Sequence, residues 1–248
     1  MPKKKKHTSD VTHSKNEEGS ICRIPMSPAE VGKSEPTQIN EITWRIFRIM
    51  AEFVEGFQFL SAFDREVTFW GSARLKPSTK WYKEAVKLGK MLAGCGYTVI
   101  TGGGGGIMEA GNKGAKQGGG RSVGLNIQLP FEQATNNFVT DGRSFHYFFT
   151  RKVMMAASAQ AYVFWPGGFG TLDEFFEIVT LIQTKKMQKT PVICVGKEFW
   201  DGLFEWSAKV QRDEMKTIGK KDLDLIQVVD SAEEAFEIVR NSKERTFF

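Results

Sequence analysis

The stretch WPGGFGTLDE, residues 165–174, decides the fold predicted for this chain. It follows a short apolar run at 161–164 and precedes an apolar pattern with helical spacing that starts at Phe175. This order predicts a strand, a glycine turn and the N-terminus of a helix. Backbone N–H groups beside glycines approach an anion closely, and the dipole of the following helix favours negative charge there. We therefore expect an anion site, with the carboxylate of Glu174 one turn further along the helix.

Strands and helices alternate in the same manner along most of the chain. The alternation predicts an α/β fold, a doubly wound, Rossmann-like parallel sheet with helices on both faces. Ligands of such sheets bind at the carboxyl ends of the strands, where the glycine turn lies. Residues 130–146 are expected to form a long loop. We expect strands at 67–70, 97–101, 122–127, 161–165, 191–195 and 225–229, and helices at 79–94, 107–117, 147–159, 199–215 and 231–240, with one more helix after Thr171.

Three segments of the chain differ in composition. Residues 1–38 are polar and rich in Ser, Lys, Glu and Pro, and we expect them to form a disordered tail. The run from Lys3 to Lys6 fits either a solvated terminus or a nucleic-acid contact, and the polar composition around it favours the first. Residues 39–63 carry Ile and Phe at helical spacing and predict an N-terminal amphipathic helix. Residues 64–248 are expected to form the α/β domain.

The overall composition indicates a globular protein with a sizeable core. Of the 248 residues, 41% are hydrophobic and 25% are charged, and the formal net charge is +5. No apolar run approaches the roughly 18 residues of a membrane span, and the N-terminus does not resemble a secretory signal. Cys22, Cys95 and Cys194 have no metal-like spacing. We expect them to be reduced, buried thiols in a cytoplasmic protein, and we expect no metal site.

A second glycine-rich loop, TGGGGGIME at residues 101–109, also follows an expected strand. It lacks the Lys-Ser/Thr pair that ends a Walker A loop, which argues against ATP hydrolysis of the P-loop type. Its glycines either contact a ligand or only allow close strand–helix packing at a tight turn. The sequence leaves both interpretations open.

Four side chains near the first loop have both a structural and a functional interpretation. Thr171 and Glu174 have the Thr-x-x-Glu spacing of a capping box, in which Thr171 is the N-cap and Glu174 bonds back to its backbone. In the other interpretation Glu174 is chemically active. Arg151 and Lys152 lie at an expected helix start, where cations oppose the helix dipole. They indicate either a nearby anion or carboxylate, or a basic pair on the surface.

These residues resemble the LONELY GUY family of phosphoribohydrolases, long labelled lysine decarboxylases. The family signature Pro-Gly-Gly-x-Gly-Thr-x-x-Glu is present at 166–174, and Arg151 lies 23 positions before Glu174, which fits the family spacing. GSAR at 71–74, TGGG and GIMEA within 101–110, and GLNI and LPFEQ within 124–133 also match. The resemblance covers about residues 67–240 and is closest to the longer bacterial branch, which has an extra N-terminal helix. Gly105 is a departure, because that branch often has proline there.

The resemblance implies hydrolysis of the N-glycosidic bond of a nucleoside 5′-monophosphate to a free base and ribose 5-phosphate. The substrate would be a cytokinin riboside 5′-monophosphate or AMP, without a cofactor, in a homodimer. Arg151 and Glu174 would be the catalytic pair. The residues implied to bind phosphate, ribose or base are Gly103, Gly104, Glu132, Lys152, Gly167, Gly168, Phe169, Gly170 and Thr171.

Two other classes of function are weighed against this one. The first is a non-catalytic nucleotide-binding or molybdenum-cofactor carrier protein of the same superfamily, which the intact Arg151 and Glu174 argue against. The second is a lysine decarboxylase, which normally needs pyridoxal phosphate on a lysine, and the sequence has no recognisable setting for it. The sequence predicts neither a membrane partner nor a nucleic-acid partner. The motifs do not specify which base is preferred.

Overall fold

The structure, a computed structural model, describes residues 36–128, 135–157 and 159–245. It divides into two units, Met1–Ile46 and Phe47–Phe248, and helix α1 (Pro36–Leu60) begins in the first and ends in the second. The predicted N-terminal helix at 39–63 therefore exists, with ends that differ by three residues on each side. The predicted tail at 1–38, including Lys3 to Lys6, lies almost wholly outside the described residues.

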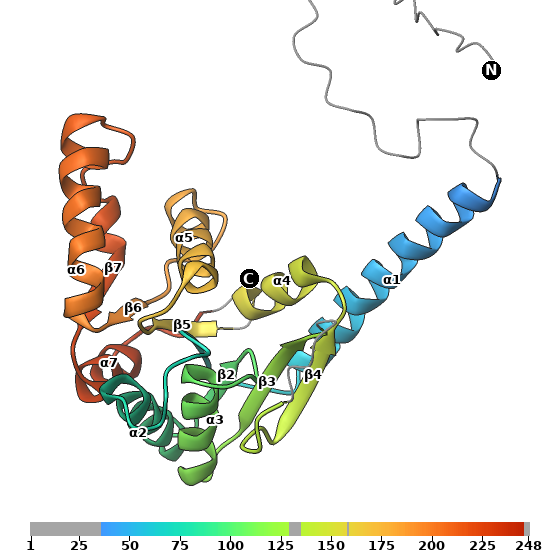
Figure 1. The fold of residues 1–248 in the computed structure, drawn as a ribbon, viewed down its shortest axis with the longest axis horizontal. Helices are drawn as coiled ribbons and strands as arrows, with labels where there is room; N and C mark the ends of the chain where they lie inside the picture. The colour runs from blue at the N-terminus through green and yellow to red at the C-terminus, as the bar shows by residue number, and fades with distance from the viewer. Residues whose placement is uncertain (1–35, 129–134, 158, 246–248) are drawn as a thin grey trace, which may run out of the picture. The chain divides into compact units, whose positions relative to one another are not determined.

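The second unit is built on a seven-stranded sheet in which every pair of neighbouring strands is parallel (Figure 1). The strand order is β4-β3-β2-β1-β5-β6-β7, so the chain winds outward from β1 in one direction and then in the other. This confirms the doubly wound α/β fold. The strands are β1 (Glu66–Trp70), β2 (Thr98–Thr101), β3 (Ser122–Ile127), β4 (Asp141–Phe145), β5 (Ala159–Phe164), β6 (Val192–Val195) and β7 (Ile226–Val229).

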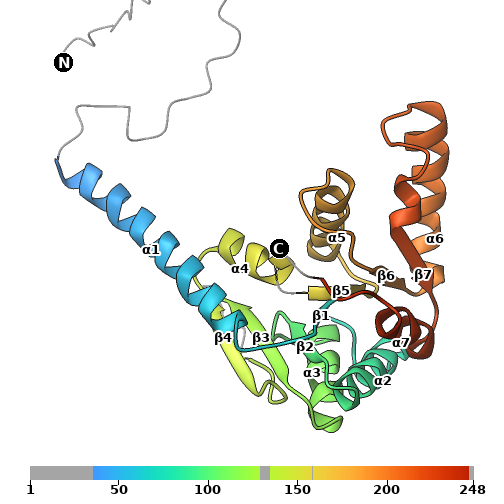
Figure 2. The ribbon, with the colours of Figure 1, turned by 180° about the vertical axis from the view of Figure 1, so that it is seen from behind.

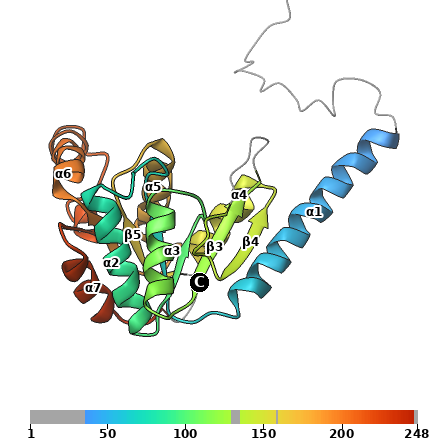
Figure 3. The same cartoon turned by 60° about the horizontal axis from the view of Figure 1, so that its bottom comes forward.

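Helices cover both faces of the sheet (Figures 1 and 2). The helices α2 (Lys80–Gly94), α3 (Ile107–Gln117) and α7 (Ala232–Arg240) pack on one face, and Figure 3 shows α2 and α3 in front of the strands. The other face carries α4 (Phe148–Ala157), α5 (Phe169–Gln183), α6 (Lys197–Trp206) and the end of α1. A π-helical stretch, Ser207–Glu214, continues α6, and a short 3-10 helix, Asp222–Leu225, precedes β7.

Successive strand residues divide the core into two layers. Val99 and Val163 belong to the layer under α2, α3 and α7, whereas their neighbours Ile100 and Phe164 belong to the layer under α4, α5 and α6. Side chains alternate between the two faces of a strand, and both faces are covered, so these strands need continuous apolar runs. That requirement is why the central strands were predictable from the sequence.

Two predictions about local structure are wrong. The predicted loop at 130–146 contains the strand β4, whose sequence DGRSF is polar because it lies at the edge of the sheet and is only partly buried. Arg143 on this strand forms an ion pair with Glu55 of α1. Of the thiols expected to be buried, Cys194 is buried but Cys95 is exposed, because it follows directly after α2 at the surface. Cys22 lies outside the described residues.

In the described ranges no helix is long and apolar enough to cross a membrane. The same ranges contain no group of three or more His, Cys, Asp or Glu side chains placed to hold a metal ion.

Candidate active site

A cleft of about 770 Å³ opens at the carboxyl ends of β1, β2 and β5. The direction in which the chain winds reverses between β1 and β5, and ligands of doubly wound sheets bind at such a reversal. The residues that line the cleft come from the strand ends and the loops after them, from α3, α4 and α5 and from the start of α6. Those used below are Trp70, Ser72, Gly102, Met108, Phe148, Arg151, Gly167, Gly168, Phe169, Gly170, Thr171, Glu174 and Phe199.

Helix α5 begins three residues earlier than the capping-box interpretation requires. Gly168 is the N-cap, with φ −95° and ψ −160°, and no side chain caps this end. Thr171 is therefore the third helical residue and Glu174 the sixth, so the prediction of Thr171 as N-cap is wrong. Leu172 N–H donates to the Gly168 carbonyl at 3.1 Å, and the N–H groups of the three residues before it precede the helical hydrogen-bond ladder. A glycine cap thus leaves the first turn of α5 available to an anion.

The glycines of the β5–α5 loop (residues 165–168) and of the first turn of α5 have two different roles. A Cβ atom at Gly167 would lie 2.1 Å from Thr171 Oγ1, so this glycine lets the loop pack against the helix. At Gly168 and Gly170 a Cβ atom would meet nothing within 4 Å. These two glycines border open space in the cleft, as does Phe169, whose side chain is 93% exposed.

Arg151 and Glu174 face each other across the cleft wall. Arg151 Nη2 lies 4.0 Å from Glu174 Oε1, and both side chains are buried. The guanidinium also lies over the Phe148 ring, 5.0 Å from its centroid. Burial lowers the pKa of Arg151, while the charge of Glu174 raises it. The structure therefore brings together the two residues that the family resemblance implies as the catalytic pair.

Two buried N–H donors on the cleft wall have no hydrogen-bond partner within the described residues. They are Arg151 Nε and Trp70 Nε1. A buried donor without a partner is costly, and most such groups in folded proteins are satisfied by protein, water or ligand. Both atoms belong to side chains that line the cleft, but each atom is itself covered from solvent.

The surroundings of Glu174 favour the neutral form of its carboxyl group more than water does. Burial raises its pKa to about 8, Lys152 and Arg151 oppose the shift, and the nearby Glu177 adds to it. A group with such a pKa changes charge just above neutral pH, which is the range in which acid–base catalysts operate.

Lys152 lies behind Glu174, among three carboxylates of α5. Its Nζ atom is 2.6 Å from Asp173, 3.1 Å from Glu177 and 3.9 Å from Glu174. Burial lowers its pKa, but the ion pairs outweigh this effect and the pKa is raised overall. The sequence placed Lys152 in the substrate-binding set, whereas the structure places it in this ion-pair cluster and not among the residues that line the cleft.

The β2–α3 loop (residues 102–106) is packed rather than open. Gly103 has φ +71°, and a Cβ atom there would lie 2.1 Å from Asn126 Oδ1. Asn136 Nδ2 donates to the carbonyls of Gly103 and Gly104 at 3.1 and 2.9 Å. Within the described part of the chain Gly102 lines the cleft, but Gly103 and Gly104 do not. Their contact with substrate stays a prediction, and Glu132 lies outside the described residues.

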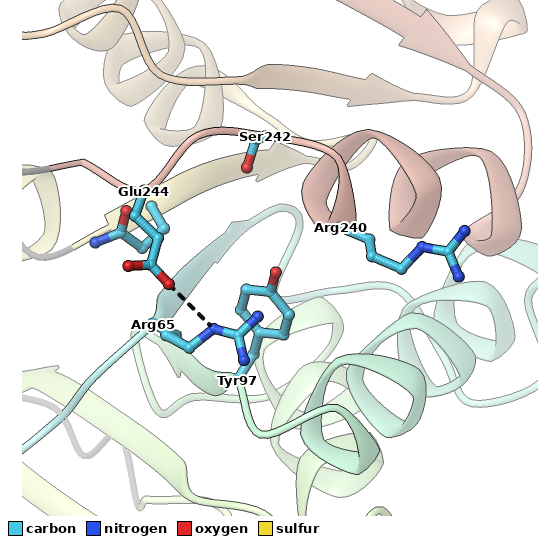
Figure 4. A pocket seen from close by; sticks show the side chains of 6 residues that line it. Arg65, Tyr97, Arg240, Ser242 and Glu244 are labelled. Atoms are coloured by element: carbon cyan, nitrogen blue, oxygen red, sulfur yellow. Dashed lines mark ion pairs between the residues drawn. The ribbon is translucent and has the colours of Figure 1, made fainter.

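A smaller pocket of about 160 Å³ lies at the opposite, amino-terminal edge of the sheet (Figure 4). Arg65 Nε is 3.8 Å from Glu244 Oε1 there, and the guanidinium lies over the Tyr97 ring at 4.1 Å. The two charged side chains are 43% and 76% exposed, so solvent screens the pair. Arg240 points away from this pair in Figure 4. The catalytic candidates thus lie at the other end of the strands.

Several residues of the cleft have no motif that could have marked them. Phe148 and Phe199 line it from the starts of α4 and α6, and their only signal is a position just after an expected strand or loop. Ser72 lies in the matching GSAR segment and at a strand end, so the sequence had indicated its location. Glu177 lies one turn after Glu174, but its contact with Lys152 is tertiary and has no sequence signal.

Comparison with known proteins identifies relatives for the region that forms this cleft. The model of a family described as "Possible lysine decarboxylase" matches residues 108–239, just over half of the chain. A probable cytokinin riboside 5′-monophosphate phosphoribohydrolase of Oryza sativa subsp. japonica is 31% identical over 152 residues, which are 60% of this chain and 61% of the relative. A second rice protein, a cytokinin riboside 5′-monophosphate phosphoribohydrolase, is 33% identical over 53% of this chain and 54% of its own length. The chain therefore spans between half and two thirds of these relatives.

Solved structures support the same fold. The molybdenum cofactor carrier protein from Chlamydomonas reinhardtii superposes with a TM-score of 0.54 and 22% identity, over 71% of this chain and 96% of that one. The molybdenum cofactor binding protein from Rippkaea orientalis gives a TM-score of 0.52 and 22% identity, over 71% and 93%. At this level of identity the likeness concerns the fold alone.

Proposed function

Since this chain belongs to the LONELY GUY family of phosphoribohydrolases, we propose that it hydrolyses the N-glycosidic bond of a nucleoside 5′-monophosphate. The products are a free base and ribose 5-phosphate. The substrates we propose are AMP and cytokinin riboside 5′-monophosphates, since proteins with the latter activity in their names are among its relatives. The reaction needs no cofactor in this proposal.

The observation that carries the proposal is the arrangement of α5, which supplies both an anion site and a buried acid. The 5′-phosphate would lie on the N–H groups of Phe169, Gly170 and Thr171, where Gly168 leaves the helix end uncapped. The ribose would then lie over the next turn of the helix, beside Glu174.

Glu174 would act in its ionised form. As the bond between C1′ and the base nitrogen breaks, positive charge develops on the ribose, and a carboxylate beside it stabilises this charge. Water then forms the new bond to C1′ and gives its proton to Glu174. The electron pair of the broken bond goes to the base, which takes up the proton from the carboxyl group. Arg151 holds Glu174 in place through the contact at 4.0 Å and favours its ionised form.

The apolar part of the cleft would hold the base. Met108, Phe148 and Phe199 line the cleft together with Trp70, and their flat or flexible apolar surfaces suit a planar ring. They also suit an apolar substituent on that ring. We therefore include N6-substituted adenines among the bases to be tested.

The test is release of base from nucleotides by the purified full chain. We expect free adenine from AMP, or the substituted adenine from a cytokinin riboside 5′-monophosphate, on chromatography. Glu174→Gln should lower kcat by about 10²–10⁴-fold, since it removes the proton acceptor but leaves the shape of the side chain. Asp173→Asn, the neighbouring exposed acid, is the matched control and should keep most of the activity.

Two outcomes would contradict the proposal. Full activity of Glu174→Gln would remove Glu174 from the reaction. Tight binding of AMP by the wild-type chain without release of base would instead favour the non-catalytic carrier class. The first conclusion requires a folded Glu174→Gln variant, so its thermal unfolding should be checked first.

We also propose that the chain forms a homodimer in the cytoplasm, as the family resemblance and its cysteine usage imply. Phe149 on α4 and Phe176 on α5 are 45% and 41% exposed, and their apolar rings suit a contact with a second copy. Light scattering on the purified chain gives the mass directly. A monomer at micromolar concentration would exclude the dimer.

A further inference from the structure

We propose that Lys152 and Glu177 form a positioning pair, which sets the ionisation of Glu174 through opposing charges placed outside the substrate cleft. The proposal rests on the proposed function, because it assigns these two residues a role in the same reaction. Neither residue lines the cleft, so neither is expected to touch the nucleotide.

The pair is defined by its contacts. Lys152 Nζ lies 3.1 Å from Glu177 Oε2 and 3.9 Å from Glu174 Oε2, so one ammonium group bridges two carboxylates on successive turns of α5. The Lys152 side chain is 16% exposed and that of Glu174 is 3% exposed. The charges of Lys152 and Glu174 are therefore weakly screened, whereas Glu177, whose side chain is 31% exposed, is partly screened by solvent.

The two members act on Glu174 in opposite directions. Lys152 favours the ionised carboxylate, as an ammonium group within 4 Å does. Glu177 disfavours it, through its negative charge and through a side-chain hydrogen bond to the neutral form. The remaining charged neighbour that acts on Glu174 in the described residues is Arg151 on α4, which favours the ionised form.

Glu177 faces groups on two further elements. Lys152 approaches it from α4, and the Tyr162 hydroxyl of β5 is near enough for Glu177 to raise the pKa of the phenol, after burial, which is the larger cause. That pKa is about 12, so Tyr162 stays neutral over the working range of pH. The pKa of Lys152 is raised above its usual value, so its ammonium group stays charged near neutral pH. Among these groups, Glu174 is therefore the one whose charge Glu177 can influence in that range.

Asp173 provides the matched control for this pair. It also contacts Lys152, at 2.6 Å, but its side chain is 55% exposed, and it is not among the groups that act on Glu174. Asp173→Asn and Glu177→Gln thus each remove one negative charge from beside Lys152. In Asp173→Asn the lost charge is one that solvent screens.

The first measurement is the pH dependence of kcat and KM with AMP for the wild type, Glu177→Gln, Lys152→Met and Asp173→Asn. Because Glu174 must be ionised, kcat should rise with pH and level off above a midpoint near 8. We expect the midpoint to move down by about one pH unit in Glu177→Gln and up by about one unit in Lys152→Met. It should stay in place in Asp173→Asn, and KM should change little in all three because the phosphate site is intact.

The second measurement does not depend on activity. Each of the four proteins is compared with its own Glu174→Gln partner by thermal unfolding between pH 4 and pH 10. Because folding raises the pKa of Glu174 above its usual 4.5, its contribution to stability is complete below that value and is lost as pH rises through the folded pKa. The loss of stability should be complete at a lower pH in Glu177→Gln and at a higher pH in Lys152→Met.

Opposite displacements in both measurements support the pair, because a merely structural role would not move a midpoint in two directions. Unmoved midpoints, or displacements of the same sign, overturn it. If the wild type releases no base but the unfolding midpoints still move apart, the proposed function fails and the pair stands. If base is released and neither midpoint moves, the function stands and the pair fails.

Discussion

The two glycine loops of this chain look alike in sequence and differ in what surrounds them. The β2–α3 loop is enclosed: Asn136 holds its carbonyls, and added Cβ atoms at Gly103 and Gly106 would lie within 2.3 Å of other atoms. In the other loop Gly168 and Gly170 border empty space at the start of α5. Glycine serves close packing in the first case and borders open space at the start of a helix in the second. A glycine run is therefore no evidence of a site until its surroundings are known.

Of the substitutions that test this difference between the loops, Gly106→Ala should change the free energy of unfolding the most. Gly106 has φ +63°, and a Cβ atom there would lie 2.3 Å from the Ser72 carbonyl oxygen. We expect the free energy of unfolding to fall by about 3 kcal/mol, from backbone strain and overpacking together. Chemical denaturation measures this loss. Gly105→Ala is the control: its Cβ atom would meet only the Ala73 carbonyl oxygen, at 3.5 Å, and stability should be nearly unchanged.

Asn136→Ala tests how much the side chain that packs on the β2–α3 loop contributes to stability. The Asn136 amide donates to the carbonyls of Gly103 and Gly104 and to Asn112 Oδ1 at 2.9 Å. Losing these bonds should cost about 2 kcal/mol of stability, since buried acceptors lose their donor. Affinity for ribose 5-phosphate, measured by calorimetry, should stay the same. A loss of affinity without a loss of stability would mean that this loop also binds ligand; the exposed Asn137→Ala serves as control.

Gly170→Ala should have the smallest effect on stability, and of the opposite sign. The position is helical and open, so alanine should raise the free energy of unfolding by about 0.5–1 kcal/mol. The added methyl group should at the same time weaken binding of ribose 5-phosphate several-fold. Gly202→Ala in α6 is an equally open helical glycine and should give the gain without the loss. Unchanged binding in Gly170→Ala would show that the first turn of α5 is not the phosphate site.

The central strands and the alternation of the fold could be predicted because burial on both faces requires apolar runs such as that of β5. The edge strand β4 could not, because two of its five residues are exposed and its sequence resembles a loop. The start of α5 was misplaced at Thr171 because a favourable capping residue was present, while the structure uses Gly168.

Some residues of the candidate site could be predicted from the sequence, and others could not. Arg151 and Glu174 were implied by the family spacing, and the structure adds their separation and burial. Lys152 was expected at the substrate, but its environment depends on Asp173 and Glu177 from another helix, which spacing does not reveal. The aromatic lining from α4 and α6 likewise depends on tertiary packing.

Helix α5 also sets the distance between its N-terminal end and the carboxyl group of Glu174. Glu174 lies six residues after Gly168, which is about 9 Å along the axis of a helix that rises about 1.5 Å per residue. A nucleotide anchored by its terminal phosphate at the helix start must bring its C1′ atom to the carboxyl group across that interval. A diphosphate or triphosphate anchored in the same way would place its sugar too far along, and a nucleoside would have no anchor. In the proposed reaction, one rigid helix would thus discriminate nucleotides by the number of phosphates that they carry.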